Sequence, residues 1–255
     1  MLEAVGLVKR FGGFTAVDGC SLTVAERSMT GLIGPNGAGK TTLFNLLGGY
    51  YRPDGGQVRF KGRDISRLKP HQRFNVGLVR TFQIPHEFAR MTVLENLTVV
   101  PPGQLGEGLA AAWFWPWGVA RQEAKIRTRA LEVLEFLKLS HVKDNPAEAL
   151  SGGQKKLLEL GRAVMSGNRC VLLDEPAAGV NRALLGDLAE RISDLHRIGY
   201  TFLIIEHDME FIGKLCHPIY VMAEGKVLTQ GTMADIRRDH RVVEAYLGHS
   251  GDAAA

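Results

Sequence analysis

The sequence has no long hydrophobic run. No stretch of about 18 or more consecutive apolar residues occurs among the 255 residues, so the chain is not expected to span a membrane. The first residues, Met1 to Gly6, contain neither a basic segment nor an apolar core, so no secretory signal is expected there. These absences still allow a protein that rests against a membrane surface.

Cysteine is scarce, and neither sign of charge dominates. Cys20, Cys170 and Cys216 lie far apart and are odd in number, which argues against a disulfide framework and favours a reduced, cytoplasmic compartment. Lys and Arg total 31 against 27 Asp and Glu, a formal net charge of +4. This mild excess fits an acidic ligand, a nucleotide or a membrane surface, and does not demand nucleic acid.

Glycine, in contrast, is plentiful. The 30 glycines are more than the usual share of about 7% of a chain, and no Gly-x-y period appears. We therefore expect them at turns and at places where the backbone closely approaches a ligand. The composition, 45% hydrophobic and 23% charged, is that of a globular protein. At roughly 150 residues per domain, the length predicts one or two domains.

Short apolar runs alternate with segments of helical period. The runs 30–33, 170–173 and 201–205 end at glycine or acidic residues, which is typical of strands buried on both faces of a parallel sheet. Apolar residues at helical spacing fall within 126–137 and 184–195. Shorter alternating segments, 21–24 and 57–60, predict an added antiparallel sheet, and 219–228 predicts a hairpin. The tail 249–255 is expected to be disordered.

All three tryptophans, Trp113, Trp115 and Trp117, fall between Leu109 and Ala120. One interpretation is a surface that touches a partner or the membrane interface. The other is packing inside a helical insertion, which general burial trends favour.

One glycine-rich segment fits the pattern G-x-x-x-x-G-K-S/T, after a predicted strand and before a predicted helix from Thr41 to Leu47. Such glycines let backbone N–H groups cradle phosphate, and the helix start adds partial positive charge. Lys40 is expected to reach the β- and γ-phosphates, and the Thr41 hydroxyl to bind Mg²⁺. The predicted nucleotide-binding residues here are Gly34, Pro35, Asn36, Gly37, Ala38, Gly39, Lys40, Thr41 and Thr42.

Phosphate chemistry needs a second acidic site, and Asp174-Glu175 follows the apolar run 170–173. Asp174 is predicted to hold the Mg²⁺ shell, and Glu175 to polarise a water for in-line attack on the γ-phosphate. Acidic residues at the end of a strand are by themselves a weak indication of a catalytic site. Here the phosphate loop supports that interpretation.

Together these motifs resemble those of the ATP-binding cassette (ABC) ATPases. Leu150-Ser151-Gly152-Gly153-Gln154 is similar to the family's signature motif, and Gln83 to its Q-loop glutamine. His207 resembles the switch histidine, and Phe11 stands where the family carries an aromatic ring that stacks on adenine. The motifs occur in family order from about residue 5 to 232. Asn181 departs from the pattern, because many relatives have aspartate there.

The resemblance implies a fold and roles for these residues. The implied fold is α/β, a P-loop NTPase cassette with a mostly parallel sheet core, an antiparallel β subdomain and a helical subdomain. The core would comprise 1–91 and 166–248, and the helical subdomain, with the signature motif, 92–165. Gln83 would join Thr41 and Asp174 at Mg²⁺ and assist Glu175 and His207 in catalysis.

The signature residues Ser151, Gly152, Gly153 and Gln154 would bind the γ-phosphate of ATP held by an opposite subunit, so two chains would sandwich two ATP molecules. Taken alone, Ser151-Gly152-Gly153 is a helix N-cap with a flexible entry. Taken alone, His207 is a satisfied core histidine, whereas its place in the family order favours a γ-phosphate contact.

A narrower resemblance points to the ATP-binding subunits of branched-chain amino acid importers, carried by 174–181, 205–209 and 242–248 together with 80–83 and 91–97. It implies a second ATP-binding subunit, identical or paralogous, transmembrane permease subunits, and a periplasmic binding protein indirectly. It also implies a peripheral place on the cytoplasmic face of the inner membrane. Residues Ile84 to Arg90 and the tryptophan segment are candidate contacts with a coupling helix.

Other functions stay open at this point. The wider group includes motors for urea or short-amide import and for lipopolysaccharide extraction. A soluble ABC ATPase of translation or DNA repair usually has two cassettes or a long coiled-coil insertion, and neither is present. A GTPase should show Asn-Lys-x-Asp, which is absent, and a P-loop kinase should lack the signature motif. A purely structural nucleotide-binding module should lose Glu175 or His207, and both are present.

Overall fold

The structure, a computed structural model, describes residues 1–81, 87–108 and 113–248, without the side chains of Leu247 and Gly248. The chain forms two compact units. Unit 1 comprises Met1–Arg80, Arg169–Ala177 and Ser193–Ala255, and unit 2 comprises Thr81–Asn168 and Ala178–Ile192. The predicted disordered tail, 249–255, lies outside the described residues.

A six-stranded sheet in the order β10-β9-β3-β8-β7-β6 forms the centre of unit 1. Five of its strands run parallel, and β10 pairs antiparallel with β9, which forms the expected hairpin. Every residue of β7 and β8 is buried, as expected for apolar runs covered on both faces. The strands are β3 (Met29–Ile33), β6 (Leu78–Arg80), β7 (Cys170–Asp174), β8 (Thr201–Ile205), β9 (Ile219–Ala223) and β10 (Lys226–Gly231).

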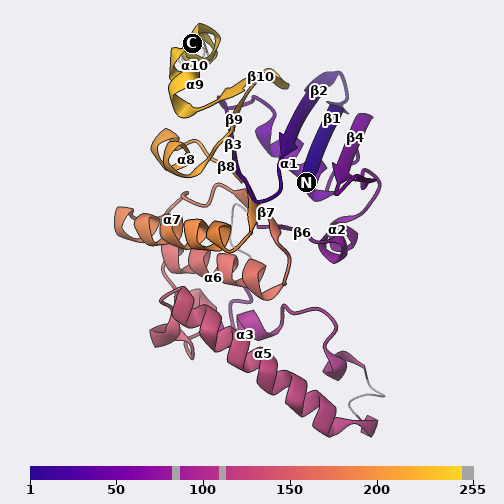
Figure 1. Ribbon diagram of the computed structural model, residues 1–255, viewed down its shortest axis with the longest axis vertical. Coiled ribbons are helices and arrows are strands. Elements are labelled where there is room, and N and C mark those ends of the chain that lie inside the picture. The colour runs from indigo at the N-terminus through magenta and orange to yellow at the C-terminus, as the bar shows by residue number, and fades with distance from the viewer. Residues whose placement is uncertain (82–86, 109–112, 249–255) are drawn as a thin grey trace. The chain divides into compact units, whose positions relative to one another are not determined.

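The predicted antiparallel sheet is also present in unit 1, with the order β2-β1-β4-β5. Its strands β2, β1 and β4 lie side by side in Figure 1. Its long strands alternate buried and exposed side chains, so one face packs on the core and the other faces solvent. The strands are β1 (Leu2–Phe11), β2 (Phe14–Val24), β4 (Gly55–Phe60) and β5 (Arg63–Asp64).

Helix α1 (Lys40–Gly48) lies in the hydrophobic core of unit 1. Its side chains Leu43, Phe44, Leu46 and Leu47 are fully buried. Buried Arg73 stabilises its C-terminal end, because its Nη1 donates hydrogen bonds of 2.6 Å to the carbonyls of Leu46 and Leu47. Unit 1 also contains α2 (Pro70–Val76), α8 (Met209–Leu215), α9 (Met233–Arg238) and α10 (His240–Gly248).

Unit 2 is helical. Two of its helices start with capping boxes, Thr92 with Glu95 at α3 and Ser151 with Gln154 at α6. Gly161 lets α6 pack closely, since a Cβ there would come within 2.6 Å of the Leu137 side chain. The helices are α3 (Val93–Thr98), α5 (Pro116–Phe136), α6 (Gly152–Met165) and the first part, 182–192, of α7 (Arg182–Arg197), with short 3₁₀ turns Leu105–Glu107, Ser140–Val142 and Ala147–Ala149.

The tryptophans do not pack inside unit 2, so that interpretation is wrong. Trp113, Trp115 and Trp117 are 83%, 58% and 84% exposed. They lie at the N-terminal end of α5, and the buried residues of this helix, Ala130, Val133 and Leu134, lie towards its other end. Among the described helices, none combines the length and the apolar character needed to cross a bilayer.

Candidate functional site

The expected strand-end site forms in unit 1 because β3, β8 and β7 are adjacent and in register. Leu32 of β3 and Asp174 of β7 are both paired with Ile205 of β8. The carboxyl ends of parallel strands meet at one edge of a sheet, where such sheets bind ligands. The phosphate loop, Asp174-Glu175 and His207 therefore lie at the same edge.

The phosphate loop depends on glycine at its two ends. Gly39, the N-cap of α1, has φ 93°, and a Cβ there would collide with the Ala16 carbonyl. A Cβ at Gly34 would collide with the Met222 carbonyl. No side chain caps α1, and its first turn holds no acidic residue. This helix start is therefore suited to receive an anion.

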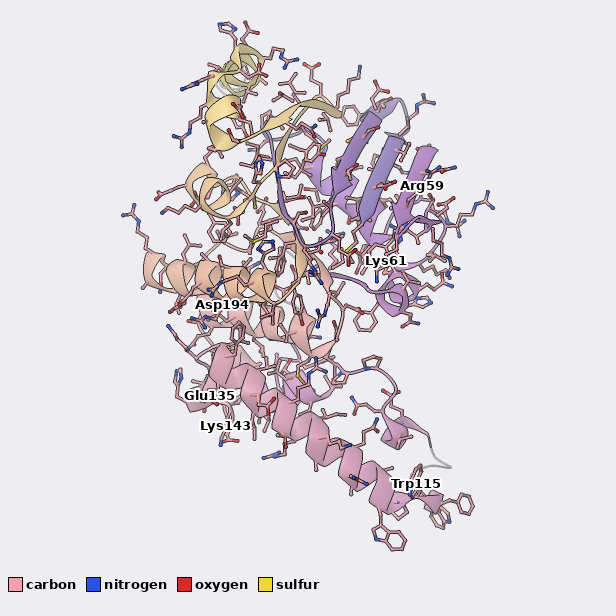
Figure 2. All side chains as sticks on the ribbon, in the orientation of Figure 1. Arg59, Lys61, Trp115, Glu135, Lys143 and Asp194 are labelled. Carbon is pink, nitrogen blue, oxygen red and sulfur yellow. The ribbon has the colours of Figure 1, made fainter. Side chains whose placement is uncertain are left out.

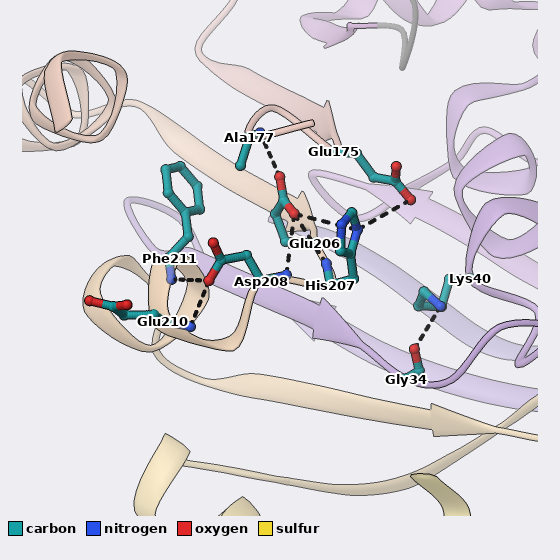
Figure 3. Close-up of polar contacts among 9 residues, drawn as sticks. All are labelled: Gly34, Lys40, Glu175, Ala177, Glu206, His207, Asp208, Glu210 and Phe211. Carbon is teal, nitrogen blue, oxygen red and sulfur yellow. Dashed lines mark hydrogen bonds and ion pairs between the residues drawn. The ribbon is translucent and has the colours of Figure 1, made fainter. Parts of the chain in front are cut away.

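Lys40 folds back over the loop that precedes it (Figure 3). Its Nζ donates hydrogen bonds of 2.8 Å to the carbonyls of both Gly34 and Pro35. Burial lowers the pKa of Lys40, while the charge of Glu175 acts in the opposite direction. The ammonium group is thus held within the loop and within electrostatic reach of Glu175.

Glu175 leaves the sheet through an unusual backbone conformation. Its φ is 46°, and its N–H donates to the Ile205 carbonyl at 3.0 Å. The Glu175 Oε1 lies 3.9 Å from Nδ1 of His207, whose side chain is 66% exposed. The interpretation of His207 as a buried core histidine is therefore wrong, and the imidazole is accessible beside the predicted base.

Glu206 holds the loops after β7 and β8 together, a role that the sequence analysis missed. Its fully buried carboxylate accepts hydrogen bonds from the N–H groups of Ala177, at 2.6 Å, and His207, at 3.1 Å (Figure 3). Burial raises its pKa, and these hydrogen bonds act in the opposite direction. The feature of the sequence that could have indicated this role is the position of Glu206, directly after an apolar strand.

Asp174 is buried and paired with Arg80, which the sequence analysis also did not assign. The Arg80 guanidinium donates to Asp174 Oδ2 at 2.8 Å and to the Asn45 side chain at 2.7 Å. It also packs over the rings of Phe44 and Tyr50. Arg80 thus links α1 to the end of β7 and holds the Asp174 carboxylate in place.

The residues predicted to hold Mg²⁺ supply oxygen atoms, which this cation prefers. Thr41 is exposed in the first turn of α1, and Asp174 ends β7, so both belong to the strand-end edge. Gln83 lies outside the described residues. Within those that are described, no cluster of three or more His, Cys, Asp or Glu side chains could hold a metal ion.

Phe11, the predicted adenine contact, ends β1 and is 44% exposed. Its ring meets that of Tyr51 edge to face, with centroids 5.3 Å apart, and the Lys9 ammonium lies 5.5 Å from its centroid. An exposed ring held in this way offers a face to a planar group. Stacking on adenine stays a prediction.

The signature residues lie in unit 2, where they start α6. Ser151 Oγ accepts from the N–H of Gln154, and Gln154 Oε1 accepts from the N–H of Ser151 at 3.0 Å, so the helix starts at Gly152. A Cβ on Gly153 would lie within 2.6 Å of the Leu184 side chain. The N-cap interpretation thus describes the structure, and the phosphate contact stays a prediction.

Asn181, which departs from the family pattern, caps α7 in unit 2. Its Oδ1 accepts a hydrogen bond of 2.9 Å from the N–H of Leu184. A neutral amide performs this capping as well as a carboxylate does.

The last described helix, α10, reaches the phosphate loop. Burial raises the pKa of Tyr246 to about 12, and a hydrogen bond with the backbone of Gly34 acts in the opposite direction. Tyr246 stood in the segment 242–248 that carried the narrower resemblance, but the sequence did not show what it touches.

Comparison with known protein families agrees with this geometry. The family described as ABC transporter matches residues 17–178, and the family described as branched-chain amino acid ATP-binding cassette transporter matches residues 226–252. The second match includes α10 and so contains Tyr246.

Two relatives align over nearly the whole chain. The probable branched-chain amino acid transport ATP-binding protein LivG of Archaeoglobus fulgidus is 44% identical, over 97% of this chain and 95% of its own. The high-affinity branched-chain amino acid transport ATP-binding protein BraF of Pseudomonas aeruginosa is 40% identical, over 98% of both.

Solved structures share the fold. A nucleotide-free ATP-binding cassette from an ABC transporter superposes with a TM-score of 0.82 at 38% identity, covering 96% of this chain and 98% of its own. The ADP conformation of an ATP-binding cassette gives 0.82 at 38%, covering 97% and 98%. With its phosphate loop, acidic strand end and signature helix, this chain belongs to the ABC transporter family, among the branched-chain amino acid transport ATP-binding proteins.

Proposed function

We propose that this chain is the ATP-hydrolysing motor of a membrane importer for branched-chain or related amino acids. The observation that carries the proposal is the meeting of Lys40, Glu175 and His207 at one edge of the parallel sheet. A phosphate cradle, a carboxylate base and an imidazole within reach of each other are what in-line attack on a γ-phosphate requires.

Each of these residues has a specific task. Lys40 moves from the carbonyls of Gly34 and Pro35 to the β- and γ-phosphate oxygens when ATP enters the loop. Glu175 accepts a proton from the attacking water. His207, 3.9 Å away, orients that water and donates a hydrogen bond to the transferring phosphoryl group.

Mg²⁺ accompanies ATP in this proposal. Bound Mg²⁺ neutralises charge that develops on the β- and γ-phosphate oxygens. Thr41 and Asp174 would hold it, together with Gln83. Arg80 fixes Asp174 Oδ2 through a hydrogen bond of 2.8 Å, and so orients this carboxylate at the end of β7.

Two chains act together, with the start of α6 in one chain facing the γ-phosphate bound by the other. The partner is a second copy or a paralogue. A dimeric ABC cassette bound to ADP and phosphate shares this fold, with a TM-score of 0.75 at 21% identity. That likeness supports the fold, and dimerisation of this chain is part of the proposal.

Transmembrane permease subunits receive the motion, and the chain works at the cytoplasmic face of the membrane. Of the candidate contact segment Ile84 to Arg90, residues 84–86 lie outside the described part. Glu87 pairs with Lys155 of α6 at 2.7 Å, and the Phe88 ring packs under the Arg162 guanidinium. A push on this segment would therefore reach α6, which starts with the signature residues.

The cargo is proposed from the relatives, which are named for branched-chain amino acid transport at 38 to 44% identity. The ATP-binding subunit does not contact the cargo. Urea, short amides and lipopolysaccharide are the alternative cargoes, and urea is the control in the experiment below.

The test is reconstitution of the chain with its permease and binding protein in proteoliposomes, followed by ATPase and uptake assays. Uptake of leucine should require ATP, and urea should not be transported. Glu175→Gln should lower kcat by about 100-fold or more while ATP still binds. Wild-type turnover by this variant would refute the assignment of the base, and ATP-driven urea uptake without leucine uptake would refute the cargo.

A further inference from the structure

Unit 2 carries an exposed aromatic surface that takes no part in the proposed ATP hydrolysis. Trp113, Phe114 and Trp117 are 83%, 82% and 84% exposed, and Trp115 is 58% exposed. We call these four residues the aromatic end of α5. Figure 2 shows Trp115 at the free end of this helix, away from the labelled Glu135 and Lys143. Four large aromatic side chains exposed within five positions mark an interaction site.

The surface has a fixed centre. The Trp115 carbonyl accepts hydrogen bonds from the N–H groups of Gly118, at 3.0 Å, and Val119, at 3.2 Å. The indole of Trp115 lies over Gly118, because a Cβ there would come within 2.7 Å of its ring atoms. Trp115 is therefore anchored on the first turn of α5, and the rings on either side of it project from that anchor.

Basic side chains follow the aromatic end along the helix. Trp117, Arg121 and Lys125 are spaced by four residues, which places them on one face of α5, and all three are exposed. Arg127 and Arg129 are exposed as well, and Glu123 is the one acidic residue between positions 116 and 129. The first two thirds of α5 thus combine exposed indoles with a positive charge.

We propose that the aromatic end of α5 docks on an anionic phospholipid bilayer, with its indoles at the headgroup level and Arg121 and Lys125 beside the lipid phosphates. Tryptophan prefers this interface because its ring is apolar while its N–H remains hydrogen-bonded. Basic residues next to interfacial aromatics add attraction to anionic lipid. The proposal needs neither ATP nor a permease, so it can be tested apart from the proposed function.

The positive charge is the reason to choose lipid over another protein. An apolar groove on a permease would accept the four rings but gives no account of Arg121, Lys125, Arg127 and Arg129. An anionic lipid surface accounts for both. Docking on a permease alone is therefore one of the outcomes that would overturn the proposal.

The chain supplies its own reporter, because its three tryptophans all lie in the aromatic end. The full-length chain is mixed with phosphatidylcholine vesicles containing either no phosphatidylglycerol or about 30% of it. Vesicles with phosphatidylglycerol should shift the tryptophan emission to the blue and carry the protein upward in a flotation gradient. Brominated lipids should quench that emission.

Two double variants separate the aromatic from the electrostatic contribution. Trp113→Ser/Trp117→Ser should weaken flotation with anionic vesicles by about tenfold or more. Arg121→Gln/Lys125→Gln should weaken it by about 25-fold at low salt, at roughly fivefold for each basic residue removed. These side chains are exposed, so circular dichroism and ATP affinity should stay those of the wild type.

Matched controls lie in unit 1. Phe14→Ser removes an aromatic side chain that is 64% exposed, and Arg237→Gln/Arg238→Gln removes two exposed basic residues of α9. Both should bind vesicles as the wild type does. Wild-type binding by Trp113→Ser/Trp117→Ser, equal losses in the controls, or a blue shift produced only by a detergent-solubilised permease would each overturn the proposal.

Discussion

The helices α1 and α6 both start beside glycine and are both predicted to meet phosphate, yet their first turns differ. Helix α1 follows the N-cap residue Gly39, which is in the left-handed region, and no side chain caps the helix. Helix α6 follows the N-cap residue Ser151, which has φ −64°, and a reciprocal Ser151–Gln154 box covers its first turn. Each start thus reflects a different use of glycine.

At α1, glycine provides backbone conformation and space, whereas at α6 it allows close packing. Gly39 has a φ that side chains rarely adopt, while Gly153 is needed because Leu184 lies against it. The uncapped start can receive phosphate without losing a hydrogen bond. At the capped start, phosphate must share N–H groups with Ser151 or displace its hydroxyl. We therefore expect a single chain to bind nucleotide through α1 alone.

Lys40→Ala should have the largest effect of the variants that test the difference between the two helix starts. It removes the ammonium group that Gly34 and Pro35 hold in the loop. ATP affinity, measured by calorimetry, should fall by about 100-fold or more, which is about 2.7 kcal/mol. The matched variant is Lys155→Ala at the start of α6, which should leave the affinity of the single chain unchanged. Equal losses in both variants would mean that both helix starts bind nucleotide in one chain.

Gly39→Ala should destabilise the protein far more than Gly152→Ala. At Gly39 a methyl group meets both a left-handed φ and the Ala16 carbonyl, so the free energy of unfolding should drop by about 3 kcal/mol. At Gly152 the nearest atom to a Cβ is the Gly179 carbonyl at 3.1 Å, and a cost of about 1 kcal/mol or less is expected. Urea unfolding measures both, and similar costs would contradict the distinction.

Glu206 should make the α1 site sensitive to pH, in contrast to the neutral box at α6. Burial raises the pKa of Glu206 in the folded state. As the pH rises above about 4.5, the Glu206 carboxyl group therefore loses its proton in the unfolded chain before it does so in the folded chain. Stability from this group is therefore present at low pH and falls as the pH rises towards the folded-state pKa, by at most about 1.4 kcal/mol per pH unit.

Glu206→Gln should remove that slope. Glutamine offers one acceptor oxygen to the N–H groups of Ala177 and His207, so the variant starts less stable. Urea unfolding measures the free energy of unfolding of both proteins. The difference between Glu206→Gln and the wild type should become smaller as the pH rises from 5 to 8. A difference that is constant or widens over that range would contradict the raised pKa. Ser151→Ala serves as the pH-independent control.

Ser151→Ala should have only a small effect on stability. It removes one half of the capping box, at a cost of about 1 kcal/mol in the free energy of unfolding. Ser151→Asp keeps an acceptor at the N-cap and should recover most of that loss. Helix α1 has no equivalent side chain to remove. A loss above about 3 kcal/mol would show that Ser151 does more than cap the helix.

Local patterns were enough to predict the fold and the loops of the strand-end site. The runs 170–173 and 201–205 became β7 and β8, since uninterrupted apolar residues are stable only between covering layers. The phosphate loop and Asp174-Glu175 lie at their ends because parallel strands share a carboxyl edge. These features depend on residues that are close in sequence.

The missed features depend on partners far along the chain. Arg80 meets Asp174 across 94 positions, and Glu206 meets Ala177 across 29, so neither pairing can be seen in the sequence. The general tendency of tryptophan to be buried also led to a wrong prediction for the three tryptophans. That tendency describes residues that stabilise a fold. The exposed aromatic end of α5 has no part in the described core of unit 2.

The order of the central sheet has a consequence for synthesis. Strand β3 carries the phosphate loop near the start of the chain, but its neighbours β8 and β9 come after Tyr200. A nascent chain must therefore expose β3 unpaired while most of the protein is still being made. ATP cannot stabilise the emerging N-terminal half, and a messenger truncated before β8 should yield a product that aggregates rather than a small nucleotide-binding domain.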